Sequence, residues 1–377
     1  MKRICSLLLT IIIGIMYIPT AMAETIPVSI KELQGMTDPV WEQTYEAYGR
    51  TIRVNTEIVV PKAERIPLLA IKPMEPLSEE DVQKYEEMFS TPYSSKFLND
   101  KYRTYISFSD HKGHPDLSNA EKVTTPNRPL YEYDRNQAYT EDNDLTVAQA
   151  ENLVRQNIQK VFPGVDFRVD KIVINDRTKY RKSGKKLEAK GYYELDCAQV
   201  IDGIPVAGSI HAAYRNERTK HDRIISNYGT ASAAVTDEGN FYGRYSIWDK
   251  AAKLGSPDQF LPFDAIRPQI EEMILSGNIR HVFSVDFGYA QYDLPEDCKY
   301  EYVLVPAWVV SVGWMDDPEE EDDGATSVNG SDYAMGCTYL PIIVNALTGE
   351  ATNPLDESNG RMLLPASWMQ WVEESYP

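Results

Sequence analysis

The segment TVAQAENLVRQNIQKVFPG, residues 146–164, contains the signals of a complete amphipathic helix. Thr146 and Gln149 have the spacing of a capping box, in which each side chain bonds the backbone N–H of the other. Pro163-Gly164 is a typical stop signal. The apolar residues between these signals recur at helical spacing: Val147, Ala150, Val154, Ile158, Val161 and Phe162.

A second segment of the same kind occupies residues 263–277. Phe263, Ile266, Ile270, Met273 and Ile274 fall on one helical face, and Gly277 closes it. Strand-like runs follow each helix: 168–174, 191–201, 206–214 and 223–228 after the first, then 281–292, 300–312 and 338–347 after the second.

This order predicts an internal repeat of one helix packed on an antiparallel meander. Such a unit buries one apolar layer, so the predicted fold class is α+β. Asp202-Gly203 predicts a tight turn inside the first meander. We therefore expect two α+β domains at 145–250 and 260–355, a β-rich N-terminal region at 24–140 and a C-terminal tail at 356–377. The near alternation in 51–60 and the short run 66–71 supply the β character of the N-terminal region.

Three motifs resemble the PepSY-like domains of peptidase propeptides and exported bacterial regulators. The first is Tyr-x-x-x-x-Ala-Gln-Val-Ile-Asp-Gly-Ile-Pro-Val at 193–206; the second and third are Val-Pro-Ala-Trp at 305–308 and Ile-Val-Asn-Ala-Leu-Thr-Gly at 343–349. The whole chain resembles a family of uncharacterised exported proteins from gut Gram-positive bacteria. Many of those carry a lipobox cysteine, which this chain lacks because Cys5 precedes the apolar core. The resemblance implies tandem PepSY-like domains and no established catalytic residues.

The first 23 residues have the pattern of an export signal. Lys2 and Arg3 precede an apolar stretch at 7–18, and Ala21-Met22-Ala23 fits a cleavage site. The sequence predicts cleavage between Ala23 and Glu24, with an uncleaved signal anchor as the alternative. Since no later segment is apolar enough to span a bilayer, we expect a secreted or cell-envelope protein with no membrane span after cleavage.

Charge excludes two classes of partner. The chain has 38 Lys+Arg against 57 Asp+Glu, a net charge of −19. That balance argues against nucleic-acid binding, which requires clustered cations, and against docking on anionic lipid. A neutral or basic partner is expected instead.

Of the four cysteines, Cys197, Cys298 and Cys337 would remain after cleavage. Cys197 falls on the apolar side of a predicted strand, which indicates a buried thiol. Cys298 and Cys337 each precede a strand of one expected hairpin, so they should lie at opposite ends of the ladder, too far apart for a disulfide. A disulfide is the alternative.

Two clusters could bind metal. Asp110, His111, His114 and Asp116 supply zinc-type ligands, but no third strong ligand is identifiable and a solvated loop is the preferred interpretation. An acidic run begins at Asp316 and ends at Asp323. Its contiguous acids cannot all converge on one calcium ion, so a solvated hairpin tip is favoured. No cofactor is expected.

No nucleophile signature such as Gly-x-Ser-x-Gly occurs. The hypothesis is therefore a non-catalytic binding or regulatory protein. It would act outside the cytoplasmic membrane on a protein, a peptide or a cell-wall ligand, through an exposed sheet edge. One alternative is a hydrolase built from scattered acids or the His111/His114 loop. Another, by analogy with propeptides, is a peptidase-inhibitor-like module.

Overall fold

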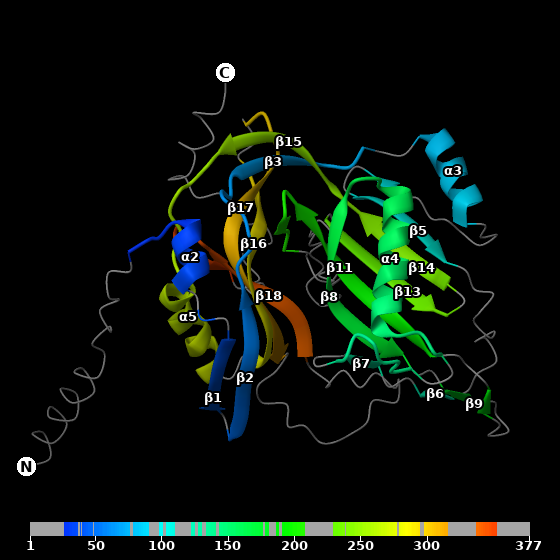
Figure 1. Ribbon diagram of the computed structural model, residues 1–377, viewed down its shortest axis with the longest axis horizontal. Helices are drawn as coiled ribbons and strands as arrows, with labels where there is room; N and C mark the ends of the chain where they lie inside the picture. The colour runs from blue at the N-terminus through cyan, green and yellow to red at the C-terminus, as the bar shows by residue number, and fades with distance from the viewer. Residues whose placement is uncertain are drawn as a thin grey trace, which may run out of the picture.

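The described residues form two large sheets, each covered by one helix, that lie side by side, and a small three-stranded ladder (Figure 1). This is an α+β arrangement in which strands dominate, as the sequence predicts. The structure, a computed structural model, describes residues 26–36, 38, 40–47, 49–75, 78–89, 98–100, 103–109, 122–124, 127–129, 133–140, 143–175, 178–180, 186–187, 191–207, 229–237, 239–276, 279–294, 298–315 and 337–352. The predicted signal sequence with Ala23 and Glu24, the tail at 356–377 and the strand at 223–228 lie outside these residues.

The first sheet, here called the α4 sheet, is antiparallel and lies under helix α4 (Val147–Val161). Its order is β4-β5-β14-β13-β11-β8-β7, with β12 paired to β11. The strands are β4 (Leu98–Asp100), β5 (Arg103–Ser109), β7 (Asn127–Pro129), β8 (Asp166–Asn175), β11 (Tyr192–Ile201), β12 (Ile204–Pro205), β13 (Thr230–Thr236) and β14 (Gly239–Ser246).

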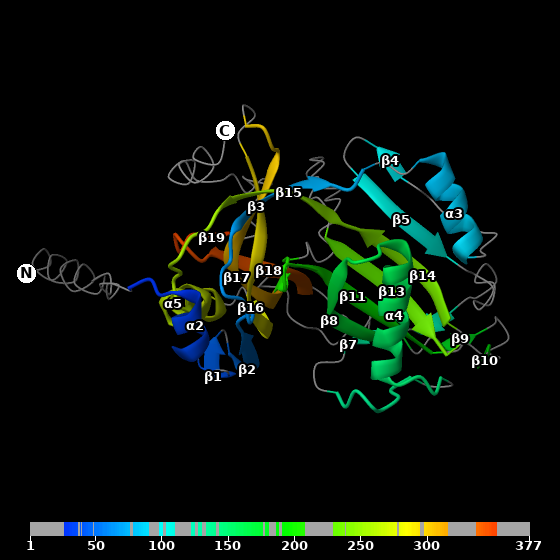
Figure 2. The ribbon, with the colours of Figure 1, turned by 45° about the horizontal axis from the view of Figure 1, so that its top comes forward.

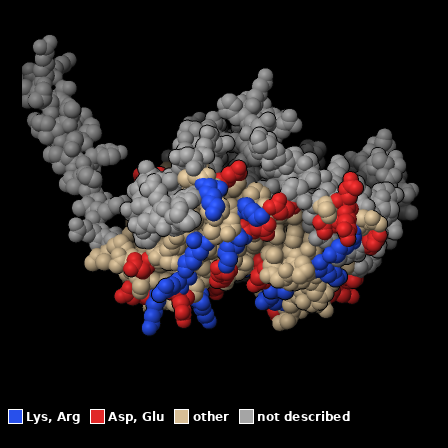
Figure 3. All heavy atoms as spheres, turned by 90° about the horizontal axis from the view of Figure 1, so that it is seen from above, with Lys and Arg blue, Asp and Glu red and all other residues tan. Residues whose placement is uncertain are grey.

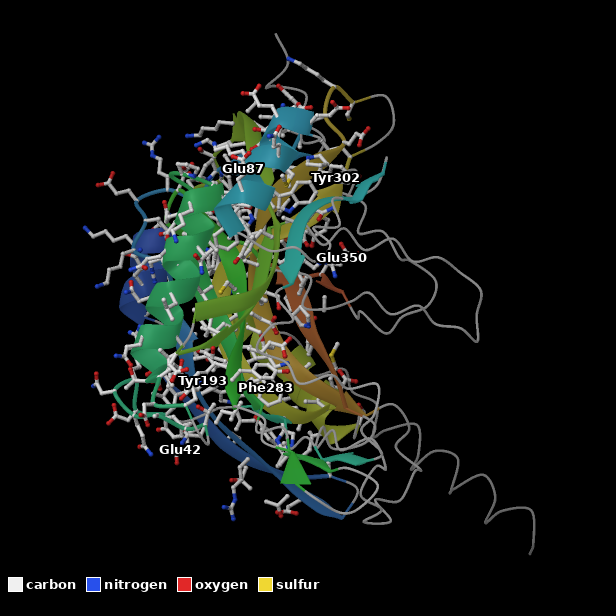
Figure 4. All side chains as sticks on the ribbon, turned by 90° about the vertical axis from the view of Figure 1, so that its right-hand side faces the viewer. Glu42, Glu87, Tyr193, Phe283, Tyr302 and Glu350 are labelled. Atoms are coloured by element: carbon white, nitrogen blue, oxygen red, sulfur yellow. The ribbon has the colours of Figure 1, made fainter. Side chains whose placement is uncertain are left out.

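Helix α4 begins and packs as its sequence predicts. Thr146 N–H donates to Gln149 Oε1 at 2.8 Å, and Gln149 N–H donates to Thr146 Oγ1 at 3.3 Å, which completes the capping box. The apolar face of the helix is buried against the sheet. Tyr193 lies beneath the helix, fully buried (Figure 4), and its hydroxyl accepts the N–H of Tyr139 at 2.7 Å.

The second sheet, the α5 sheet, has the order β1-β2-β16-β17-β18-β19, and β3 joins β17 to β15. All its pairs are antiparallel except β2 with β16. It consists of β1 (Val40–Ala47), β2 (Arg50–Val59), β3 (Leu68–Pro73), β15 (Trp248–Gly255), β16 (Ile279–Asp293), β17 (Tyr302–Met315), β18 (Cys337–Asn345) and β19 (Ala351–Thr352), covered by α5 (Phe263–Leu275).

Trp308 is the centre of the packing under α5. It is fully buried, its ring contacts those of Phe263 and Phe287 with centroids at 5.4 Å and 4.9 Å, and its Nε1–H donates to Leu261 O at 2.9 Å. Because the indole N–H has a partner, this large side chain is buried without an orphaned donor.

The N-terminal region is β-rich as predicted, but among the described residues its strands are distributed over several sheets. One of them, β6, pairs with β9 in the small ladder β10-β9-β6. Strands β1, β2 and β3 join the α5 sheet, whereas β4, β5 and β7 join the α4 sheet. The chain passes from β3 through α3 (Glu79–Phe89) to β4, and it returns from β14 to β15 (Figure 2). The remaining elements are α2 (Ile30–Met36), β6 (Lys122–Thr124), β9 (Thr178–Tyr180) and β10 (Lys186–Leu187).

The cysteines lie as the sequence predicts. Cys197 is buried on β11. In the β17–β18 ladder Met315 lies opposite Cys337, while Cys298 precedes Tyr302 at the other end. Within the described residues, no helix has the length and apolar character to cross a membrane.

Candidate binding sites

A hollow of about 230 Å³ lies between β1 and α5, at the outer edge of the α5 sheet. We call it the edge groove. It is lined by Met36, Asp38, Val40, Trp41, Glu42, Gln43, Ile58, Pro262, Phe263, Asp264, Arg267 and Glu271.

Strand β1 is the outermost strand of the α5 sheet, and no described strand pairs with its outer side. Trp41 and Tyr45 turn inward and are buried, with Trp41 packed on Phe263 of α5. Glu42 is exposed on the same strand, at the margin of the molecule in Figure 4. The strand therefore has one side chain face anchored in the core and one backbone edge open to solvent.

The edge groove combines exposed apolar surface with an excess of acid. Met36 is 53% exposed and Val40 is 41% exposed. The charged lining groups are four carboxylates and one guanidinium. Arg267 lies 3.2 Å from Asp264 and 3.6 Å from Glu271, so those pairs are loose and solvated.

One carboxylate of the groove has a structural role. Tyr45 Oη–H donates to Glu271 Oε1 at 2.8 Å. Burial of the ring and the neighbouring Glu271 raise the pKa of Tyr45, so it donates at every physiological pH. Asp38 Oδ1 accepts the N–H of Val40 at 3.3 Å, whereas no described residue bonds the Glu42 carboxylate.

A larger hollow of about 530 Å³ lies where the two sheets meet. We call it the inter-sheet cleft. One wall comes from α4, β8 and the β11–β12 hairpin, and the other from the end of β2 and from β16. Its lining is Val59, Pro61, Tyr133, Arg135, Glu151, Arg155, Asp166, Phe167, Arg168, Val169, Val200, Gly203, Pro205 and Phe287.

Arg168 links the two sheets across this cleft. Its Nη1 and Nη2 donate to Asp286 Oδ1 and Oδ2 at 2.8 Å and 3.2 Å, and its Nε donates to Asp170 Oδ1 at 2.8 Å. Arg168 and Asp170 are on β8, whereas Asp286 is on β16 of the other sheet. The bidentate geometry is the strong form of an Arg–carboxylate pair.

Burial and charge act on this triad in different directions. Burial lowers the pKa of Arg168, but the charges and hydrogen bonds of Asp170 and Asp286 outweigh this effect. The net pKa is raised, so Arg168 stays charged. Burial raises the pKa of Asp170 to about 6; Arg168 opposes the shift and the charge of Asp286 adds to it. Asp170 therefore titrates within the range of mildly acidic surroundings.

A β-bulge explains the position of Asp170. Lys171 lies opposite Asp196 and Val169 lies opposite Cys197, so two adjacent residues of β11 face residues of β8 that are two apart. Asp170 is the extra residue. Beyond the bulge, the residues of β8 that face a given side of the sheet change from even to odd numbers or the reverse.

Two more arginines line the cleft. Arg135 bonds the buried carboxylate of Glu151 on α4 through Nη2. Arg155 lies 3.7 Å from Asp166, and both side chains are more than half exposed. In the face shown in Figure 3, cations and acids are likewise intermixed over the described surface, with no broad area of one sign.

The sheets also meet through backbone contacts beside the cleft. Val206 forms a parallel bridge with Tyr289, and Ala207 N–H donates to Tyr289 O at 2.6 Å. Gln199 exchanges two hydrogen bonds with the backbone of Trp248, at 2.8 Å and 2.9 Å. The turn at Asp202-Gly203 has φ of 53° and 80°, which confirms the predicted tight hairpin.

The metal-binding alternatives lie outside the described residues: Asp110, His111, His114 and Asp116, and the run from Asp316 to Asp323. Within the described ranges, no group of three or more His, Cys, Asp or Glu could hold a metal ion. Arg168 and Asp286 were not predicted, because 118 residues separate them and neither stands in a local motif.

Comparisons with known proteins show the fold alone. No family model matches the chain, and no curated protein matches it. A crystal structure of an uncharacterised protein from Eubacterium rectale is similar, with a TM-score of 0.51 and 11% identity, over 86% of this chain and 98% of that one. The likeness is consistent with the α+β class.

Proposed function

We propose that this protein is an exported, non-catalytic binding protein that takes up a basic, extended peptide segment along the open edge of β1. In this proposal its two helix-covered sheets are tandem PepSY-like modules, and the chain is released by cleavage after Ala23. The packing of α4 and α5, each on one face of a sheet, supports the modular part.

The observation that carries the proposal is the open edge of β1 beside the edge groove. An extended segment can add to such an edge, because its backbone then satisfies the unpaired N–H and C=O groups. Side chains of the added strand alternate between faces, so every second one would point toward the groove. Specificity would come from those alternate side chains.

The charge of the groove selects the class of peptide. Four carboxylates against one guanidinium leave a net charge of −3, within a chain of net charge −19. A lysine or arginine side chain fits this combination, because its aliphatic stem can lie on Met36 and Val40 while its charged end meets Asp38 and Glu42. Opposite charge would also accelerate association at low salt.

The test is fluorescence anisotropy with a labelled, end-capped peptide that alternates lysine and valine, and its glutamate–valine counterpart. We expect the lysine peptide to bind at least about tenfold more tightly at low salt, and the difference to shrink near 0.5 M salt because screening weakens exposed charge pairs. Equal affinity for the two peptides would contradict the proposal.

A matched pair of variants distinguishes attraction by the edge groove from attraction by the overall negative charge of the protein. Glu42→Lys changes the groove, whereas Glu80→Lys makes the same change at an exposed position on α3. Glu42→Lys should weaken binding of the lysine peptide by about tenfold, while Glu80→Lys should leave it nearly unchanged. Equal losses would mean that overall charge, not the groove, attracts the peptide.

The proposal that the protein is non-catalytic has its own test. The purified protein should turn over no peptide, ester or glycan substrate. Turnover that disappears in His111→Ala or His114→Ala would replace the binding proposal with the hydrolase alternative.

A further inference from the structure

We infer that the inter-sheet cleft is a second binding site, which takes a singly charged organic carboxylate carried on an apolar group. This inference is independent of the peptide site on β1, since the cleft shares no lining residue with the edge groove.

The size and position of the cleft suit a small ligand. Its volume of about 530 Å³ is within the range of small-molecule pockets, and such pockets favour the junction between two structural units. Val169 and Pro205 supply partly exposed apolar wall surface from the α4 sheet, and Val59 is 41% exposed at the rim on the other side. An apolar group of the ligand would cover this surface.

The cleft also presents guanidinium donors that protein carboxylates do not use up. Arg155 is 57% exposed, and its partner Asp166 at 3.7 Å is beyond hydrogen-bond range. Arg135 is 63% exposed and bonds Glu151 through one nitrogen. Since each guanidinium has five N–H donors, both arginines can bond an anion without losing these partners.

Arg168 adds a donor whose orientation is fixed before any ligand arrives. Asp286 and Asp170 bond its three nitrogens, and its side chain remains 35% exposed. A preorganised group loses little side chain entropy on binding, so its contribution to affinity is retained.

Charge and geometry identify the anion. The lining contains three arginines against Glu151 and Asp166, and Arg168 is also bonded by Asp170 and Asp286, so the local balance is 3 − 4 = −1. Recognition of an anion therefore depends on the exposed donors of Arg135 and Arg155 rather than on net charge, and these two guanidiniums suit a singly charged group better than a dianion. A planar carboxylate also matches the paired donors of arginine. These features favour a carboxylate over a phosphate dianion.

The test is titration followed by NMR or calorimetry with three probes: N-acetylphenylalanine, its uncharged amide and phenyl phosphate. We expect the free acid to bind, and the amide to bind at least about tenfold more weakly because it lacks the charge-assisted bonds. Arg155→Gln should weaken binding of the acid by about tenfold. Arg267→Gln, which removes an arginine from the edge groove, is the control and should have no effect.

Three results would overturn the inference: no binding of the acid up to about 10 mM, equal binding of acid and amide, or equal losses in Arg155→Gln and Arg267→Gln. Tighter binding of phenyl phosphate would overturn the assignment of a carboxylate. Glu42→Lys should leave binding of the acid unchanged, so the failure of one site can be distinguished from the failure of the other.

Discussion

The inter-sheet cleft and the edge groove both gather charged side chains, but they differ in how those charges are satisfied. In the cleft, the buried carboxylates of Glu151 and Asp286 each bond an arginine. In the edge groove, Glu42 bonds no described residue and Arg267 forms only loose, exposed pairs.

The difference follows from burial. A buried charge without a partner is strongly destabilising, so the junction of the sheets can hold Asp286 only together with Arg168. A solvated carboxylate on an edge strand carries no such penalty, since water compensates it. Charges at the junction therefore hold the fold together, whereas charges on β1 are available to a partner. Three changes test this contrast.

The largest effect should come from the close approach of the sheets. A Cβ added to Gly288 would lie 2.6 Å from Pro205 O, a backbone atom that cannot move alone. Gly288→Ala should lower the free energy of unfolding by about 3 kcal/mol, measured by urea denaturation. Gly35→Ala, in α2 with no atom within 4 Å, is the matched control and should leave stability unchanged or slightly higher. Equal stability of the two variants would show that the sheets do not meet at Gly288.

The second effect concerns the paired charges. Asp286→Ala removes the bidentate partner of Arg168 and should cost about 2 kcal/mol, less than for a fully buried pair because Arg168 is 35% exposed. Glu42→Ala in the edge groove should change stability by less than about 0.5 kcal/mol. If the two variants lose the same amount in urea denaturation, the contrast between the two regions is wrong.

The smallest effect is a pH dependence. The pKa of Asp170 is raised from 3.8 to about 6 in the folded protein, chiefly by burial. The folded state therefore binds more protons than the unfolded state between these values, so stability should fall as pH rises from about 4 to about 6, by about 1 kcal/mol, and level off above. Asp170→Asn should remove this slope. A slope that persists in Asp170→Asn belongs to another group.

Much of the fold could be predicted from local signals. The capping box at Thr146, the apolar face of α5 and the Asp202-Gly203 turn are all confirmed. Each depends on residues close in sequence, where spacing and backbone conformation determine the structure directly.

The elements that sequence missed lack such a signal. In β1 the buried residues are Trp41, Tyr45 and Ala47, so three exposed residues interrupt the alternation expected of a strand. Strand β13 reads TASAAVT; its alanines and serine have weak strand preference, and because the strand is buried on both faces no alternation marks it. The two candidate sites depend on contacts between distant segments, such as β8 with β16, which no local pattern encodes.

The most direct measurement of the central claim is amide hydrogen exchange of β1 with and without the alternating lysine–valine peptide. If the peptide adds to the sheet edge, the outward-facing N–H groups within Val40–Ala47 gain hydrogen-bond partners and should exchange at least about tenfold more slowly, while β13 in the other sheet is unchanged. Binding of the peptide with no added protection in Val40–Ala47 would contradict the account.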